Sequence, residues 1–150
     1  MNIVEIITDK NNKLETDKCL VFNTYKNIQI KTLMKTLDNV SNIVNRTLNE
    51  KRINARIRTK EDREKYMSAE TCVKFLDFYQ YAYNNVHSHS YLSVPDCYDK
   101  EVVFRLVKDV FERIDKNHKC FLENANHILK LADYSSRYFD KNNLESYRYH

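Results

Sequence analysis

The sequence predicts a mainly α-helical fold with a small β element, arranged as one compact domain over residues 1–150. This domain would have a basic part (1–68), a helical part (69–139) and a frayed tail (140–150). Of the 150 residues, 42% are hydrophobic, which suits one globular core. The chain contains no glycine and one proline, Pro95. β-Sandwiches and β-barrels usually need glycine in their tight hairpins, so helices joined by Asn- and Asp-containing turns remain.

Composition excludes several other classes of protein. Without glycine there is no P-loop, no dinucleotide-binding fingerprint and no glycine-rich kinase loop. No run of about 18 apolar residues occurs, and the first residues lack the pattern of a signal peptide. We therefore expect an intracellular protein of the cytoplasm or nucleus, without membrane contact. Four cysteines are too few for a disulfide scaffold, and the abundance of Asn, Lys, Tyr and Ile indicates an AT-rich genome, such as that of a large DNA virus or a protist.

The first half of the chain begins with two short apolar runs, residues 3–7 and 19–25. Each run fits either a strand or a buried helix end. Apolar residues at helical spacing then predict one helix over about 27–38 and a second over about 41–51. Residues 38–39, Asp-Asn, are expected to form the turn between these helices, because Asn tolerates the left-handed backbone conformation.

Apolar and polar residues alternate strictly in residues 52–58, which predicts a strand. Its core face would carry Ile53, Ala55 and Ile57. Its other face would carry Arg52, Asn54, Arg56 and Arg58. A charged loop or a single helical turn is expected to follow over residues 59–65.

The second half is expected to be helical. Apolar residues at helical spacing predict helices over about 68–83, 100–115 and 117–138. The first of these stripes consists of Cys72, Phe75, Leu76 and Tyr79. Residues 84–99 contain the single proline and are expected to form a long polar loop.

The order helix, turn, helix and arginine-faced strand over residues 28–58 resembles a winged helix-turn-helix. Leu37, Val44 and Arg46 match the turn and the start of the recognition helix in bacterial and phage repressors. The resemblance implies that residues 41–51 enter the major groove of double-stranded DNA. Independently, Asn side chains pair with adenine and Arg side chains pair with guanine. The candidate DNA-binding residues are Asn42, Asn45, Arg46, Asn49, Lys51, Arg52, Arg56 and Arg58.

Positive charge is concentrated in the same half of the chain as the predicted DNA-binding residues. Residues 1–68 contain 14 Lys/Arg against 9 Asp/Glu, whereas residues 69–150 contain 11 against 12. The excess is densest from Arg46 to Lys60, where six basic residues accompany one acid, Glu50. Such clusters are typical of nucleic-acid-binding surfaces, although a lysine-rich protein also has solvated basic faces.

A second resemblance covers residues 20–83 and is to the Bro-type amino-terminal domains of large DNA viruses. Those domains combine a small strand region, a helix pair and a helix start of the form Tyr-hydrophobic-Ser/Thr-Glu, which Tyr66-Met67-Ser68-Ala69-Glu70 resembles. Together, these features predict a viral DNA-binding protein that regulates transcription.

Catalytic and metal-binding signals are weak. No nucleophile motif occurs, so we expect neither an enzyme nor a cofactor. No metal is expected either, but a zinc site is an alternative, since zinc takes four nitrogen or sulfur ligands. Its ligands would be Cys72, His87, His89 and Cys97. A thiol on an apolar helix stripe more often packs as a small hydrophobe.

Two further features leave alternatives open. The tyrosines Tyr79, Tyr81, Tyr83 and Tyr91 form either part of the core or a stacking platform for nucleic acid or a partner. The amphipathic helices expected over 100–115 and 118–138 either close the core or form a homodimer. The alternative function is therefore a non-enzymatic helical adaptor, such as one encoded by a virus, that binds a host protein.

Overall fold

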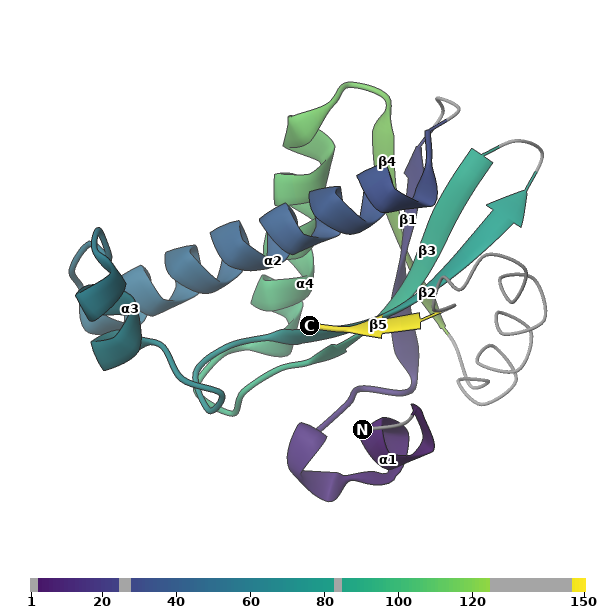
Figure 1. The fold of residues 1–150 in the computed structure, drawn as a ribbon. Helices are drawn as coiled ribbons and strands as arrows, with labels where there is room; N and C mark the ends of the chain where they lie inside the picture. Colours follow the sequence, from purple (N-terminus) through teal and green to yellow (C-terminus); the bar gives the residue numbers. More distant parts are fainter. Residues whose placement is uncertain (1–2, 25–27, 83–84, 125–146) are drawn as a thin grey trace.

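The structure, a computed structural model, describes residues 3–24, 28–82, 85–124 and 147–150 (Figure 1). The helical elements are α1 (Ile3–Thr8), the 3-10 turn η1 (Lys10–Asn12), α2 (Ile30–Ile53), α3 (Lys60–Tyr66) and α4 (Lys100–Ile114). The strands are β1 (Lys18–Thr24), β2 (Lys74–Ala82), β3 (Asn85–Ser93), β4 (His118–Asn124) and β5 (Tyr147–Tyr149). They form one antiparallel sheet in the order β4-β1-β3-β2-β5. The prediction of a mainly helical fold is therefore wrong, and the fold combines a sheet with helices.

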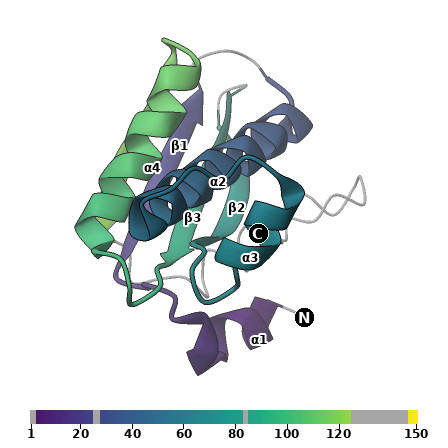
Figure 2. The same cartoon turned by 90° about the vertical axis from the view of Figure 1, so that its left-hand side faces the viewer.

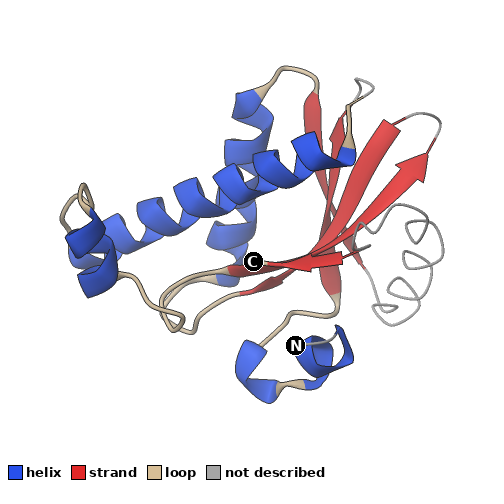
Figure 3. Ribbon diagram, in the orientation of Figure 1, coloured by secondary structure: helices blue, strands red, loops and turns tan. Residues whose placement is uncertain are grey.

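The chain follows a β-α-β-β-α-β order through β1, α2, β2, β3, α4 and β4. With the strand order β4-β1-β3-β2, this is the ferredoxin-like arrangement. Figure 2 shows α2 and α4 on the same side of the sheet. The strand that ends at the C-terminus in Figures 1 and 3 is β5, which pairs with β2 at the edge of the sheet. Because this fold serves many functions, it does not by itself indicate one.

The central strands of the sheet are buried on both faces. On one face, side chains of α2 and α4 pack against Leu20, Phe22, Phe75 and Tyr79 of the strands, among others. On the other face, α1 packs against a second cluster of Cys19, Val21, Leu76, Phe78 and Tyr91. Two-sided burial explains why the helix expected over 68–83 is instead strand β2. A strand with two apolar faces has a continuous run of apolar residues in its sequence. The spacing of apolar residues in such a run cannot distinguish a strand from a buried helix.

The helix-turn-helix expected over residues 28–51 is also wrong, because one helix, α2, runs from Ile30 to Ile53. Val40 is fully buried and keeps the apolar stripe of the first half in phase with Val44 in the second half. A helix with an unbroken stripe gains more by packing on the sheet than Asp38 and Asn39 gain by forming a turn.

The strand expected over residues 52–58 does not form, because α2 extends through Ile53 and ends there. Asn54 follows in the left-handed conformation, with φ of 54°, and its N–H bonds to the Glu50 carbonyl. The prediction that Ala55 and Ile57 both face the core holds only in part, because Ile57 is buried but Ala55 is exposed.

Several later elements also differ from those predicted. The loop expected over 84–99 contains β3, and the helix expected over 117–138 begins as β4, while residues 125–138 lie outside the described residues. The helix predicted over 100–115 is confirmed as α4, with Asp99 as its N-cap. At the end of the tail expected to fray, β5 pairs with β2.

Candidate nucleic-acid interface

The excess of positive charge gathers at one end of α2. We call residues 46–65 the basic lobe; they comprise the last third of α2, the connecting loop and α3 up to Lys65. The basic lobe contains eight Lys/Arg and four Asp/Glu, a surplus equal to the net charge of +4 of the whole chain. Figure 1 shows that this end of α2, together with α3, projects beyond the sheet. The rest of the chain is therefore electrically neutral overall, and the lobe carries the net charge.

Most cations of the basic lobe are exposed and are not used to hold the fold together. The seven exposed cations of this kind are Arg46, Lys51, Arg56, Arg58, Lys60, Arg63 and Lys65. Within the described part of the chain, none of them forms an ion pair with a carboxylate. Lys65 Nζ lies 5.0 Å from the ring centre of Tyr66. Lys60, Arg63 and Lys65 were missing from the predicted set, although the charged run 59–65 was a visible signal for them.

Two of the predicted base-reading residues cannot reach a ligand. Asn45 is 6% exposed and Asn49 is fully buried. The Asn49 amide donates to the backbone carbonyls of Asn45 and Thr71, at 2.8 and 3.0 Å. Asn45 bonds to the backbone of Val73. Both asparagines therefore fix the segment that leads into β2, whereas Asn42 is exposed.

Arg52 links the two helices of the basic lobe. Its Nη2 donates to the Asn49 side-chain oxygen at 3.1 Å and to the backbone carbonyl of Tyr66 at 2.7 Å. The second bond attaches the end of α3 to α2. Arg52 is thus a positioning residue as well as a source of charge.

The start of α3 is held by a capping box. Thr59 Oγ1 accepts from the N–H of Asp62 at 3.0 Å, and Asp62 Oδ2 accepts in return from the N–H of Thr59 at 3.0 Å. Asp62 Oδ2 also accepts from the N–H of Arg58 at 2.9 Å. These bonds to backbone N–H groups, that of Arg58 first, lower the pKa of Asp62. They hold the backbone of the loop at Arg58 and Thr59.

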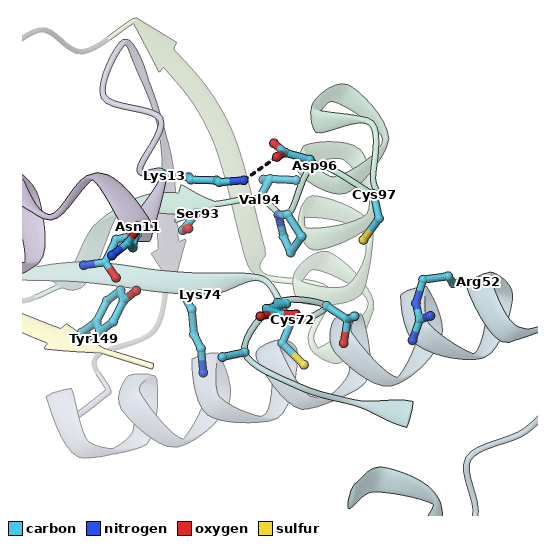
Figure 4. A pocket seen from close by; sticks show the side chains of 15 residues that line it. Asn11, Lys13, Arg52, Cys72, Lys74, Ser93, Val94, Asp96, Cys97 and Tyr149 are labelled. Atoms are coloured by element: carbon cyan, nitrogen blue, oxygen red, sulfur yellow. Dashed lines mark hydrogen bonds and ion pairs between the residues drawn. The ribbon is translucent and has the colours of Figure 1, made fainter. Parts of the chain in front are cut away.

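A hollow of about 850 Å³ adjoins the lobe, between η1 and the start of β2 (Figure 4). Lys13 and Asp96 line it and form an ion pair with each other. Arg52 and Lys74 also line it, together with one other acid, Glu70. The hollow therefore extends the positive surface of the lobe.

The four residues of the alternative zinc site are not brought together. Cys72 and Cys97 line the hollow, whereas His87 and His89 lie on β3. Across the residues that the structure places, His89 is grouped instead with Cys19 and Glu123. Burial raises the pKa of the Cys72 thiol, as expected for a cysteine that packs as a small hydrophobe.

The tyrosines and helices considered for partner binding belong mainly to the core. Tyr79 and Tyr91 are buried, and so cannot form a stacking platform. The side chain of Tyr81 and the whole of Tyr83 lie outside the described residues. The apolar stripe of α4, including Val107 and Phe111, packs into the core, which is the first of the two alternatives given for this helix.

Comparisons with known proteins add no relationship. No family model matches the chain, and neither a curated protein nor a solved structure matches it. Among the described helices, none combines the length and the apolar character that a membrane span requires.

Proposed function

We propose that this protein binds nucleic acid, with duplex DNA as its preferred form, through phosphate contacts made by the basic lobe. The observation that carries the proposal is the group of seven exposed cations in residues 46–65, which form no ion pair with any carboxylate of the described residues. Duplex DNA is a matching partner, because it presents about one negative charge per 1.7 Å along its axis.

Contacts to the phosphate backbone fit the lobe better than reading of bases. Base recognition by α2 would need several polar side chains on one exposed face. Asn45 and Asn49 are buried, and Arg52 is bonded to Tyr66. Asn42 and Arg46 remain exposed one helical turn apart. We therefore expect strong dependence on salt and little dependence on DNA sequence.

The salt dependence can be estimated. Each phosphate neutralised by a cation releases condensed counterions, and the slope of log K against log salt is about −0.9 per contact for duplex DNA. If four of the seven lobe cations contact phosphates, the slope is about −3.6. A neutral surface would give a slope near zero.

The test is fluorescence anisotropy with a labelled mixed-sequence duplex of about 30 base pairs, titrated at several salt concentrations. A lobe variant would combine Arg56→Glu, Arg58→Glu and Lys60→Glu. The matched control would combine Lys31→Glu, Lys35→Glu and Arg105→Glu, which are exposed cations outside the lobe. Both variants change the net charge equally.

We expect the lobe variant to weaken binding by about tenfold or more and to flatten the salt slope, whereas the control changes affinity by less than about threefold. Equal losses in both variants would show that only net charge matters, and would overturn the assignment to the lobe. Failure of the wild type to bind duplex or single strands at low salt would overturn nucleic-acid binding itself. The protein-binding adaptor would then be the function to test by pull-down.

A further inference from the structure

Three metal-ligating side chains meet on the face of the sheet that α2 and α4 do not cover. They are Cys19 on β1, His89 on β3 and Glu123 on β4. The sulfur, an imidazole nitrogen and a carboxylate oxygen all lie within 4.8 Å of one another. Cys19 is buried, His89 is half-buried and Glu123 is exposed, so the group opens toward solvent on one side.

The register of the sheet explains this meeting of residues distant in sequence. Cys19 and Glu123 are direct partners across β1 and β4. His89 is the partner of Val21, two residues from Cys19, which makes it a diagonal neighbour of the cysteine. Diagonal neighbours in an antiparallel sheet have Cα atoms about 7–8 Å apart, within reach of a long side chain. All three side chains point to the same face, because paired residues share a face and residues two apart do so as well.

We propose that Cys19, His89 and Glu123 bind a zinc ion. A thiolate and an imidazole select zinc over magnesium and calcium, which prefer oxygen ligands. Zinc accepts a carboxylate as its third ligand, and three protein ligands leave one tetrahedral position for water or an external ligand. The site is independent of the basic lobe, and it differs from the Cys72, His87, His89 and Cys97 set.

The geometry needs only a small adjustment to hold the ion. Metal–ligand bonds of 2.0–2.3 Å imply ligand atoms about 3.3–3.8 Å apart in a tetrahedron. The three atoms therefore have to approach one another by about 1 Å relative to the 4.8 Å limit. Glu123 can supply this movement, because its side chain is exposed and β4 is an edge strand.

Neighbouring groups are arranged to support these ligands. Tyr91 packs in the same buried cluster as Cys19. Among the described residues, the ring of His89 makes no hydrogen bond, so its nitrogens are free to bind a metal. The ring of His87 lies 5.3 Å from that of His89 and is oriented by the Gln80 side chain, 3.0 Å from its Nε2. Such outer groups tune and orient metal ligands.

Burial shifts the pKa values of two of the ligands. It lowers the pKa of His89. Burial, together with the negative charge of Glu123, raises the pKa of Cys19 to about 11. Zinc would displace the proton of the Cys19 thiol on binding.

The test uses the full chain, stripped of metal by dialysis against a chelator and then titrated with zinc in competition with a chromophoric chelator. Cys19→Ala, His89→Ala and Glu123→Ala remove the ligands one at a time. Cys97→Ala is the matched control, because Cys97 is an exposed thiol elsewhere on the surface. Cobalt provides a second readout, since a thiolate bound to cobalt gives a charge-transfer band. Circular dichroism of the metal-free variants verifies folding, and His89→Ala and Glu123→Ala keep the test valid if the buried Cys19→Ala variant fails to fold.

We expect one equivalent of zinc in the wild type and a rise in melting temperature on binding. Cys19→Ala and His89→Ala should weaken the affinity by more than about tenfold, Glu123→Ala by about tenfold, and Cys97→Ala by less than about twofold. The cobalt band should disappear in Cys19→Ala. Binding of less than half an equivalent, unchanged affinity in the Cys19 and His89 variants, or a loss in Cys97→Ala equal to theirs would overturn the proposal.

Discussion

Both ends of the Asn45 side-chain amide bond to the backbone of Val73. Oδ1 accepts from the Val73 N–H at 2.6 Å, and Nδ2 donates to the Val73 carbonyl at 3.0 Å. Val73 directly precedes β2 and is 1% exposed, so its backbone groups have no access to water. A side chain in the middle of α2 thus provides the pair of bonds that a neighbouring strand would otherwise supply.

Asn45→Ala should therefore be strongly destabilising. The substitution leaves a buried N–H and a buried carbonyl without partners, at a cost of about 2–3 kcal/mol in the free energy of unfolding. Asn42→Ala is the matched control on an exposed position of the same helix, and should change that free energy by less than about 0.5 kcal/mol. Urea denaturation of the two variants measures the difference. Equal midpoints for both would contradict a structural role for Asn45.

Asn45 also shows why the sequence suggested a recognition helix. Asn42, Asn45 and Asn49 look equivalent in a sequence, because a polar residue at helical spacing is expected to face solvent. The structure buries two of them against residues 71–73, which the sequence alone cannot place beside α2. The apolar stripe of α2 was predictable, but the partner of its polar residues was not.

The sheet was harder to predict than the helices. β2 is apolar on both faces because α1 covers the face that α2 leaves open, and this removes the period-two alternation that indicates a strand. The absence of glycine favoured a mainly helical fold, but an antiparallel sheet forms without glycine. Cys19 and Glu123 lie 104 positions apart in the sequence and become neighbours only through the β1–β4 register. By contrast, α4 was predictable because its cap and its single apolar face are local features.

Asp77 is a fully buried carboxylate that three side chains hold in place. It accepts from the Tyr79 hydroxyl at 3.0 Å, lies 2.5 Å from His150 Nε2, and also accepts from the Ser90 hydroxyl. The other ring nitrogen of His150 lies 3.3 Å from Asp38, on α2. This network connects β2, β3 and α2 with the residue that follows β5.

Asp77→Ala should lower the free energy of unfolding by about 3 kcal/mol or more, because it leaves three buried groups without their acceptor. His150→Ala removes one partner only, and should have a smaller effect that is concentrated in β5. Hydrogen exchange of β5 amides measures the local loss, and thermal denaturation measures the global one. Asp96→Ala is the surface control and should leave the melting temperature unchanged, since Asp96 and Lys13 are both exposed. If Asp77→Ala melted at the same temperature as this control, the network would have no structural role.

The capping box of α3 should be sensitive to acid. The pKa of Asp62 is lowered below its ordinary value of 3.8, so the carboxylate stabilises α3 above pH 3.8 and loses this effect as the pH falls through the lowered pKa. The amide signals of Arg58 and Thr59 should move together in an NMR titration, with a midpoint below pH 3.8. Asp62→Ala should remove the transition and expose both amides to exchange. Glu61→Ala, which alters a neighbouring exposed acid, should retain it; loss of the transition there would contradict the assignment to Asp62.

At high pH, Tyr79 should make the fold unstable. Burial, and then the charge of Asp77, raise its pKa far above the ordinary value of 10. Above pH 10 the unfolded chain releases the Tyr79 proton while the folded chain retains it, so stability falls as pH rises, by about 1.4 kcal/mol per unit. Tyr79→Phe should show a shallower decline above pH 10, at a cost of about 1 kcal/mol near neutral pH for the lost hydrogen bond. Denaturation midpoints between pH 8 and 11, followed together with the ultraviolet absorbance of tyrosinate, measure both effects. If wild type and Tyr79→Phe lost stability equally steeply above pH 10, the Tyr79 hydroxyl would ionise as readily in the folded chain as in the unfolded one. That result would contradict the effect of burial beside Asp77.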